Sequence, residues 1–148
     1  MARIRAVSDR LSDRTGDLDF LTPYARALGI AVAGEENGVP VLCFDFERIV
    51  EGRPGHLHGG ATSGLLETAG YAALRARLAK EGRTALLKPI NITVQFLSAG
   101  KPKRSYAIGR ITRLGRRNAN LTVEAWQDDR TRPIASAVMN ILMANARD

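Results

Sequence analysis

The chain has 148 residues, of which 45% are hydrophobic and 25% are charged, as expected for one soluble globular domain. A single cysteine, Cys43, excludes an internal disulfide framework, and two histidines are too few for a thiolate or histidine metal site. The sequence lacks a run of about 18 apolar residues and an apolar core near its start, so it predicts neither a membrane span nor a signal peptide. We therefore expect a cytoplasmic protein without a bound metal.

The formal net charge of +7 is concentrated in the last third of the chain. Residues 100–148 hold ten basic and four acidic side chains, so they carry six of the seven excess positive charges. Such a surface attracts an anionic partner, either nucleic acid or a phosphate-bearing cofactor. Aromatic residues make up only 5% of the chain and are missing from residues 114–118, which disfavours a base-stacking surface. For any single arginine, an ordinary solvated face remains an alternative.

The first third of the chain predicts a flexible start, a short helix and a hairpin. Residues 1–16 lack periodicity and are expected to be flexible, and residues 17–148 are expected to form one domain. The pattern predicts a helix over residues 17–28, with Asp17 as its N-cap and Gly29 as its stop. Two extended segments follow, residues 29–33 and 39–48. The turn between them, residues 34–38, contains an Asn-Gly pair that favours a tight antiparallel hairpin.

The longest helical pattern covers residues 60–80 and ends at Gly82. Its first part, residues 61–73, is almost entirely small or apolar, so it should be buried on most sides. Only Glu67 interrupts this stretch. A buried carboxylate is costly without a partner. Glu67 is therefore either part of a salt bridge or hydrogen-bond network with an arginine, or a general base or nucleophile.

Four further strands are predicted as a meander, over residues 88–96, 105–113, 120–128 and 134–143. In the first of them the residues alternate, and those expected on one face are Ile90, Ile92, Val94 and Phe96. Asn91, with Thr93 and Gln95, falls on the other face. One apolar helix among antiparallel strands predicts an α+β fold in which the sheet curls around that helix.

A short motif at the start of the long helix points to acyl-transfer chemistry. His58 is followed by Gly59 and Gly60, and the carboxylate of Glu67 comes nine residues after the histidine. Glycines at a helix start let another molecule approach backbone N–H groups, which the helix dipole makes attractive to an oxygen gaining negative charge.

These residues, His58-Gly59-Gly60 followed by Glu67 and Thr68-Ala69, resemble the signature of hotdog-fold acyl-CoA thioesterases of the phenylacetate-pathway type, over about residues 28–145. The resemblance implies a curved antiparallel sheet around one long central helix. It also implies homodimers or homotetramers with the active site between subunits, and hydrolysis of a coenzyme A thioester. Coenzyme A is then part of the substrate, and no separate cofactor, nucleic acid or membrane partner is expected.

By this resemblance, Gly59 holds the oxyanion-hole position, where its N–H stabilises charge on the thioester oxygen. Glu67 of the neighbouring subunit activates a water or attacks the carbonyl itself, and both routes remain open. His58 either fixes the loop by bonding backbone groups or takes part beside the thioester. The expected substrate-binding residues are Gly60, Thr68, Asn91, Arg113, Arg116 and Arg117. Residues 113–117 resemble the family's basic turn, which meets the nucleotide or phosphates of coenzyme A.

Two positions depart from the family pattern. Gly52 stands six residues before the motif histidine, where many members carry an Asn or Gln that orients water or substrate. Tyr71 stands where some Glu-type relatives carry a Thr. Asn91 is a candidate for the missing polar contact, with a solvated strand residue as the alternative. The residues expected to line the acyl pocket are Leu65, Leu66 and Tyr71. Gly52 favours the alternative function of a non-catalytic acyl-CoA-binding or regulatory hotdog protein, whereas the HGG arrangement disfavours a hydratase.

Overall fold

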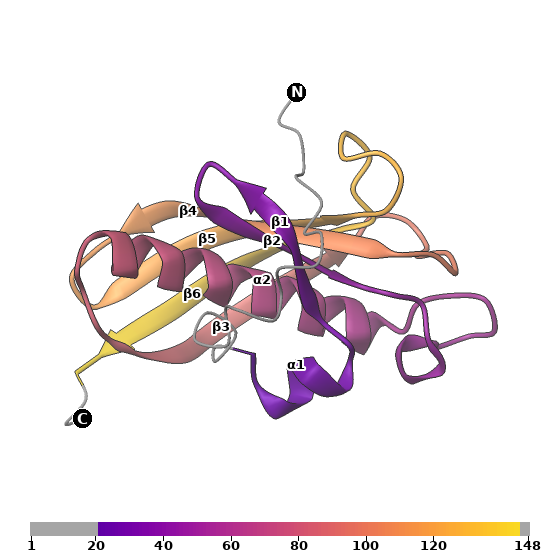
Figure 1. Ribbon diagram of the computed structural model, residues 1–148, viewed down its shortest axis with the longest axis horizontal. Coiled ribbons are helices and arrows are strands. Elements are labelled where there is room, and N and C mark those ends of the chain that lie inside the picture. The colour runs from indigo at the N-terminus through magenta and orange to yellow at the C-terminus, as the bar shows by residue number, and fades with distance from the viewer. Residues whose placement is uncertain (1–20, 146–148) are drawn as a thin grey trace.

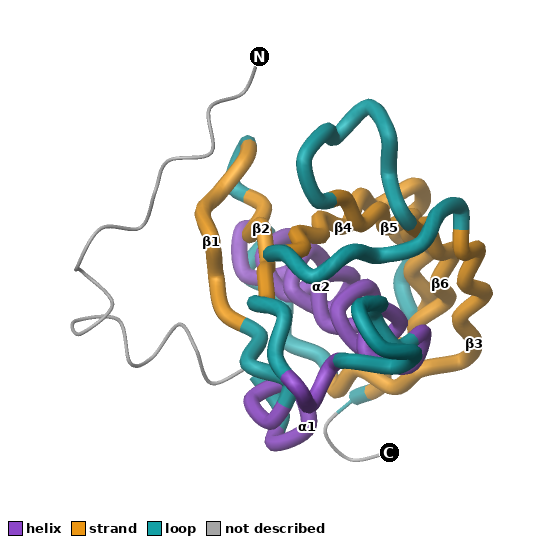
Figure 2. The backbone as a smooth tube through the Cα atoms, turned by 90° about the vertical axis from the view of Figure 1, so that its right-hand side faces the viewer, coloured by secondary structure: helices purple, strands orange, loops and turns teal. Residues whose placement is uncertain are grey.

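The structure is a computed structural model that describes residues 21–145, so the predicted flexible segment lies outside the described residues. Within that range the elements are, in chain order, α1 (Pro23–Ala27), β1 (Ala31–Glu36), β2 (Val39–Phe44), the 3-10 turn η1 (Arg48–Val50), α2 (Gly59–Lys80), β3 (Leu86–Phe96), β4 (Ser105–Leu114), β5 (Asn118–Trp126) and β6 (Ala135–Ala144). The strands form one antiparallel sheet in the order β1-β2-β4-β5-β6-β3 (Figure 1). Figure 2 shows this sheet curving around α2. The predicted α+β hotdog fold is confirmed.

Helix α2 occupies the predicted residues because both of its ends are capped. At its start, the N–H of Gly60 donates to Nδ1 of His58 at 2.8 Å, which makes His58 the N-cap. At its end, Gly82 has a φ of 65°, and the N–H groups of Gly82 and Arg83 donate to carbonyls of the last turn at 3.1 and 2.8 Å. This pair of bonds is a Schellman motif, which stops the helix. Among the described residues, no helix is long and apolar enough to cross a membrane.

Small residues let α2 lie close to the sheet. A Cβ on Gly70 would be 2.3 Å from Sδ of Met139, and a Cβ on Gly109 of β4 would be 3.0 Å from the carbonyl oxygen of Ala69. The core between helix and sheet includes the fully buried side chains of Leu42, Phe44, Leu65, Leu66, Leu74, Leu121, Met139 and Ile141. Burial of each large apolar side chain contributes about 1.5–3 kcal/mol to folding.

Strands β1 and β2 form the predicted hairpin, but its turn is shorter than predicted. Asn37 and Gly38 have φ values of 51° and 81°, the left-handed backbone that a two-residue hairpin turn requires. Residues 34–36, predicted as part of the turn, therefore continue β1. Strand β2 ends at Phe44 rather than at Arg48, because the chain then bends into the 3-10 turn η1.

The prediction for the first helix is wrong in its start. Helix α1 begins at Pro23, and Oγ1 of Thr22 accepts the N–H of Ala25 at 3.1 Å as the N-cap. Proline fits the first helical position, because its missing N–H leaves no bond unmade there. Asp17, the predicted N-cap, lies outside the described residues.

The strand order departs from the predicted meander at β3. Strands β4, β5 and β6 are consecutive neighbours, whereas β3 pairs with β6 and not with β4. Helix α2 carries the chain across to the far edge of the sheet before β3 begins. Within the described part of the chain, β3 therefore has a strand partner on one side only.

The predicted alternation in β3 holds only in its middle. Ile92 and Val94 pack against the core as expected. The pairing register shifts between Pro89 and Asn91, so Ile90 lies in a bulge and is 50% exposed. Phe96, the last residue of the strand, is 59% exposed. The free edge of the sheet thus carries apolar side chains that the described residues do not cover.

Candidate active site

The backbone before α2 is held by two hydrogen bonds to other segments. The N–H of His58 donates to the carbonyl of Val50 at 2.8 Å, and the N–H of Leu57 donates to the carbonyl of Gly100 at 3.0 Å. A Cβ on Gly100 would be 2.4 Å from Cδ1 of Leu57, so a larger residue would push the two loops apart. The loop before α2 and the loop after β3 are thus tied together at the start of the helix.

One backbone N–H in the first turn of α2 has no acceptor among residues 21–145. The N–H of Gly60 donates to the His58 ring, and the N–H groups of Ala61 and Thr62 donate to the His58 carbonyl at 3.0 and 3.1 Å. The N–H of Gly59 makes no hydrogen bond within this range. It lies at the positive end of a 22-residue helix, where an amide attracts an oxygen that carries negative charge.

The ring of Phe96 lies against Gly59. A Cβ on Gly59 would be 3.2 Å from Cζ and 3.4 Å from Cε1 of this ring, which is tighter than an ordinary contact. An accessible apolar ring therefore stands beside the unpaired amide. Sequence reasoning assigned Phe96 only to a strand face. Its position as the last apolar residue of the alternating segment is the signal that could have placed it near the helix start.

Glu67 is partly buried rather than fully buried, so the expectation of a buried acid is met only in part. Its carboxylate makes no hydrogen bond or ion pair with any residue in the described part of the chain. Tyr71 follows one turn later, and its pKa is raised first by burial and then by the negative charge of Glu67, while Arg75 opposes the shift. The structural explanation of Glu67 as one end of a salt bridge within the chain is therefore excluded for residues 21–145. Over the same residues, no three His, Cys, Asp or Glu side chains gather as a metal site.

Glu67 and Gly59 of one chain lie too far apart to act on the same atom. Eight residues of α-helix separate them, which corresponds to about 12 Å along the axis. A carbonyl oxygen within hydrogen-bond distance of the Gly59 N–H is therefore out of reach of this carboxylate. The structure places both groups on α2 but does not bring them together within one chain.

Two of the predicted substrate contacts on α2 already have partners. The Gly60 N–H is taken by the His58 ring at 2.8 Å. The Thr68 hydroxyl donates to the carbonyl of Gly64 at 2.7 Å, and the Ser63 hydroxyl donates to the carbonyl of Gly59 at 2.8 Å. Each hydroxyl thus gives its proton to its own helix.

Asn91 does not lie near the Gly59 amide. It pairs across strands with Asn140, whose Nδ2 donates to Oδ1 of Asn91 at 2.7 Å. Its neighbour Ile92 faces the core, so Asn91 lies on the face of the sheet turned away from α2. The predicted acyl-pocket residues Leu65 and Leu66 are fully buried in the core and do not line an open pocket, which corrects that expectation.

Gly52 has a structural reason to be glycine. A Cβ at this position would be 2.9 Å from Cα of His58 and 3.3 Å from its backbone nitrogen. Because these are backbone atoms, an Asn or Gln at position 52 requires the helix start to shift. The loop thus packs so closely on the backbone of His58 that it accommodates a glycine where many family members carry an Asn or Gln.

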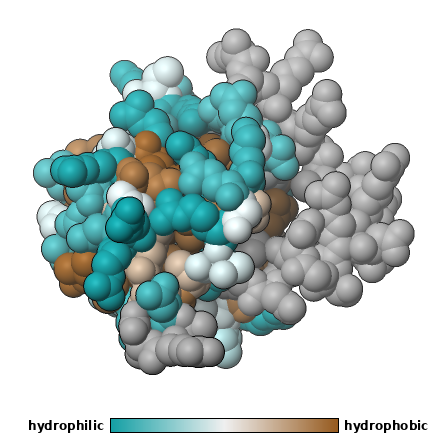
Figure 3. Space-filling view, turned by 90° about the vertical axis from the view of Figure 1, so that its left-hand side faces the viewer, coloured by the Kyte–Doolittle hydropathy of each residue, from teal (hydrophilic) through white to brown (hydrophobic). Residues whose placement is uncertain are grey.

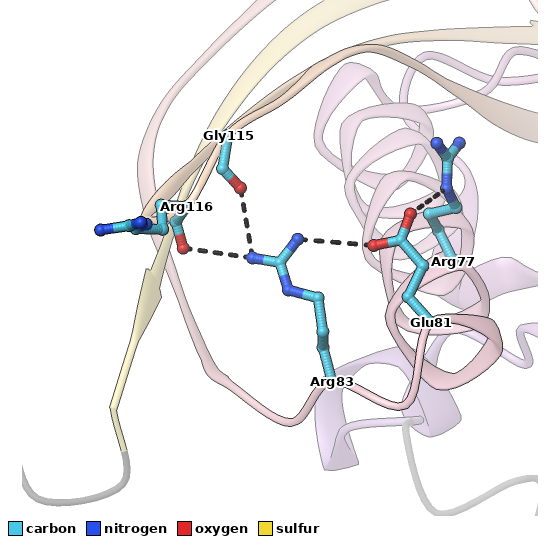
Figure 4. A network of polar contacts seen from close by, with 5 residues as sticks. All are labelled: Arg77, Glu81, Arg83, Gly115 and Arg116. Atoms are coloured by element: carbon cyan, nitrogen blue, oxygen red, sulfur yellow. Dashed lines mark hydrogen bonds and ion pairs between the residues drawn. The ribbon is translucent and has the colours of Figure 1, made fainter.

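The basic turn lies at the other end of α2 from the Gly59 amide. The carbonyls of Gly115 and Arg116 accept hydrogen bonds from Nη2 of Arg83, each at 3.2 Å, and Arg83 follows the C-terminus of the helix (Figure 4). A helix of 22 residues is about 33 Å long. The predicted Arg113, Arg116 and Arg117 belong to the β4–β5 hairpin and therefore do not lie with Gly59 of the same chain.

Comparison with known proteins identifies the family and the fold. Residues 54–134 match the family described as Thioesterase superfamily. A solved structure from Chromobacterium violaceum is 29% identical with a TM-score of 0.68, covering 89% of this chain and 90% of that one. A putative thioesterase described as phenylacetic acid degradation-related, from Ralstonia eutropha JMP134, is 19% identical with a TM-score of 0.70, covering 82% and 91% of the two chains. A thioesterase from Haemophilus influenzae is 17% identical with a TM-score of 0.75, covering 84% and 85%.

Among curated proteins, none matches the chain. The relatives under 25% identity establish the fold alone. The family match spans more than half of the chain and includes the His58-Gly59-Gly60 motif, Glu67 and the basic turn. This chain therefore belongs to the Thioesterase superfamily.

Proposed function

We propose that this protein hydrolyses a coenzyme A thioester to a free carboxylic acid and coenzyme A. The observation that carries the proposal is the N–H of Gly59, which alone among the first four amides of α2 has no acceptor in the described chain. A donor of this kind, aimed at the oxygen of an acyl-transfer intermediate, is worth roughly 2.7–4 kcal/mol. Membership in the Thioesterase superfamily supports the reaction class.

In the proposed reaction the thioester oxygen accepts the Gly59 N–H, and Glu67 of a neighbouring subunit supplies the base or the nucleophile. In the first route, Glu67 takes a proton from water as the hydroxide adds to the carbonyl carbon. The C–S bond then breaks, and the sulfur of coenzyme A takes up the proton. In the second route, the carboxylate itself attacks and displaces the thiolate, and water hydrolyses the resulting mixed anhydride. Both routes use the same two residues and need no metal or redox cofactor.

A homodimer built through β3, alone or within a homotetramer, would complete the site. The free edge of β3 exposes half or more of Leu86, Ile90 and Phe96, which supports burial of this edge against a second copy. Two copies of β3 related by a two-fold axis run antiparallel. The Phe96 end of one strand then lies beside the Leu86 end of the other.

Pairing through β3 would place opposite ends of the two chains side by side. Phe96 contacts Gly59, and the Leu86 end of β3 follows shortly after the end of α2, near the basic turn. Two-fold pairing thus brings the Gly59 amide of one chain toward the basic turn of its partner. We propose that Arg113, Arg116 and Arg117 of the partner bind the phosphates of coenzyme A while the thioester lies at Gly59.

The test is release of free thiol from a panel of aromatic and aliphatic acyl-CoA thioesters. We expect the wild type to release coenzyme A and Glu67→Gln to lose at least ~100-fold in kcat, because a positioned acid or base contributes at least that much. Since Glu67 makes no bond within the described chain, the variant should keep its thermal stability.

Glu35→Gln is the matched control, because Glu35 is an exposed carboxylate of β1 beside the hairpin turn, which lies near the last turns of α2 and not near its start. It should keep the wild-type rate. A Glu67→Gln variant as fast as this control would remove Glu67 from the mechanism.

A second candidate function is a non-catalytic acyl-CoA-binding protein. The observation that favours it is Gly52, where the backbone of His58 leaves no room for the polar residue of many family members. The same panel separates the two functions. Saturable acyl-CoA binding without thiol release would support the binding protein, and thiol release abolished by Glu67→Gln would support the hydrolase.

A further inference from the structure

Arg83 links the end of α2 to the turn between β4 and β5. Its Nη2 donates to the carbonyls of Gly115 and Arg116 at 3.2 Å each, and its Nη1 lies 3.5 Å from Oε2 of Glu81 (Figure 4). The two contacts with the turn join residues more than thirty positions apart in the chain. One guanidinium group therefore binds two backbone carbonyls and a carboxylate at the same time.

The position of this guanidinium is fixed from its own side. The backbone N–H of Arg83 donates to the carbonyl of Leu78 at 2.8 Å as part of the Schellman motif. Glu81 also binds Arg77, whose Nε donates to its Oε1 at 2.9 Å. A hydrogen bond from Arg77 and the nearby charge of both arginines lower the pKa of Glu81 below its ordinary value.

These hydrogen bonds determine which groups of the β4–β5 turn face solvent. The carbonyls of Gly115 and Arg116 point to Arg83, and the carbonyl of Arg117 accepts the N–H of Met143 at 2.8 Å. All three carbonyls of the turn thus face hydrogen-bond donors of the protein. Figure 4 shows the Arg116 side chain extending away from this network. Carbonyl oxygens repel a phosphate, so engaging them leaves the cationic side chain as the group that a phosphate meets.

Given the proposed hydrolysis of coenzyme A thioesters, on which this step rests, we propose that Arg83 is a positioning residue for coenzyme A. It holds the β4–β5 turn in the conformation that presents Arg116 to the phosphates of the nucleotide, without touching the ligand itself. Loss of Arg83 frees the turn and leaves two carbonyl acceptors open beside the phosphate site. Affinity for the nucleotide part of the substrate should therefore fall, while the rate of reaction at the thioester should stay the same.

The experiment compares Arg83→Gln with Arg77→Gln. Both variants remove one positive charge and one contact to Glu81, but only Arg83 bonds the turn. Titration calorimetry with free coenzyme A should give a Kd raised about tenfold in Arg83→Gln, the scale of losing charge-assisted hydrogen bonds, and within about twofold of wild type in Arg77→Gln. In kinetics, Arg83→Gln should raise KM for acyl-CoA, with kcat and the KM for the matching N-acetylcysteamine thioester unchanged.

Arg83→Lys distinguishes the effect of the hydrogen bonds to the turn from the effect of the charge. It also replaces Arg83→Gln in the test if that variant fails to fold. Lysine keeps the charge but lacks the planar fork, so its Kd for coenzyme A should stay at least about threefold above wild type. An Arg83→Lys variant that binds like wild type, or equal losses in Arg83→Gln and Arg77→Gln, would overturn the positioning role.

The outcomes also separate this role from the proposed hydrolysis. A wild-type protein that binds coenzyme A but releases no thiol would remove the hydrolase and leave the role of Arg83 standing. A wild-type protein that binds no coenzyme A would overturn both.

Discussion

At the scale of single residues, the candidate site depends on the Gly59 amide and the Glu67 carboxylate, neither of which has a hydrogen-bond or ion-pair partner among residues 21–145. The Gly59 N–H is available because His58 satisfies the three amides that follow it. Glu67 is available because no cation in the described chain neutralises it. Within the described part of one chain both groups lack partners, as the proposed site completed by a second subunit requires.

The contact between Gly59 and Phe96 gives a prediction at this scale. Gly59→Ala puts a Cβ 3.2 Å from the ring, so either the ring or the amide must move, and we expect kcat/KM to fall about tenfold. Phe96→Ala in the same chain removes the ring and should restore part of that loss. Steady-state kinetics of the single and double variants check this. If the double variant combined the full kcat/KM losses of the two single variants, the ring would not be what displaces the amide.

At the scale of elements, the two ends of α2 set the positions of the two halves of the proposed site. The N-cap fixes the amides around Gly59, and the Schellman motif fixes Arg83 and through it the basic turn. His58 is exposed, and among residues 21–145 its ring bonds only the Gly60 N–H, which is the loop-fixing role. A role in the chemistry remains a prediction that variants can test.

His58→Ala removes the cap and should lower the free energy of unfolding by about 0.5–2 kcal/mol. His58→Asn supplies another N-cap acceptor, so it should keep most of the stability. If His58 acts only as a cap, Asn also keeps most of the thiol-release rate. Urea unfolding and kinetics on both variants decide the matter, because a stable but inactive His58→Asn would assign the ring a part in the reaction.

Elements set by local signals could be predicted from the sequence, and those set by distant contacts could not. Helix α2, the hairpin with Asn37 and Gly38, and the three strands after β3 lie within a few residues of the prediction, because caps, turn residues and alternation are local. The pairing of β3 with β6 depends on the path of α2 across the sheet, which no local pattern encodes. The partial exposure of Glu67 was missed for a similar reason, since an apolar helix stretch does not tell which side the sheet leaves open.

The same distinction holds for the site. The motif at residues 58–60 located the helix start and its free amide, because glycines and a cap act locally. Arg83 was missed, although Gly82 marks the helix end and so marks the next residue as one with a fixed backbone. Its contacts with Gly115 and Arg116 could not be predicted, because these residues are distant in the sequence and meet only in the folded chain.

At the scale of the whole molecule, charge is concentrated at one end. Residues 75–83 and 110–117 together carry eight basic side chains and one acidic one, which accounts for the whole formal net charge of +7. These segments lie together where α2 ends and β4 meets the basic turn. Figure 3 views this end of the molecule, where hydrophilic residues cover much of the described surface.

This asymmetry predicts a salt dependence. Raising sodium chloride from about 50 to 500 mM shortens the screening length severalfold, so KM for an acyl-CoA should rise several-fold. The KM for the N-acetylcysteamine thioester of the same acid, which carries no phosphate, should stay constant. Equal salt effects on the two substrates would indicate that the basic side chains form a solvated surface and do not bind the phosphates.

The central claim is that Gly59 of one subunit and Glu67 of another act on the same thioester, and mixing two inactive variants tests it most directly. Glu67→Gln keeps the amide. Gly59→Val keeps the acid but displaces its own N–H, because a branched side chain collides with the Phe96 ring more severely than the Cβ of alanine does. Co-expressed in equal amounts, they form mixed dimers in which one of the two sites has both wild-type groups. We predict thiol release at about a quarter of the wild-type rate, the fraction of intact sites from random pairing. A mixture as inactive as its two parents would contradict a site shared between subunits.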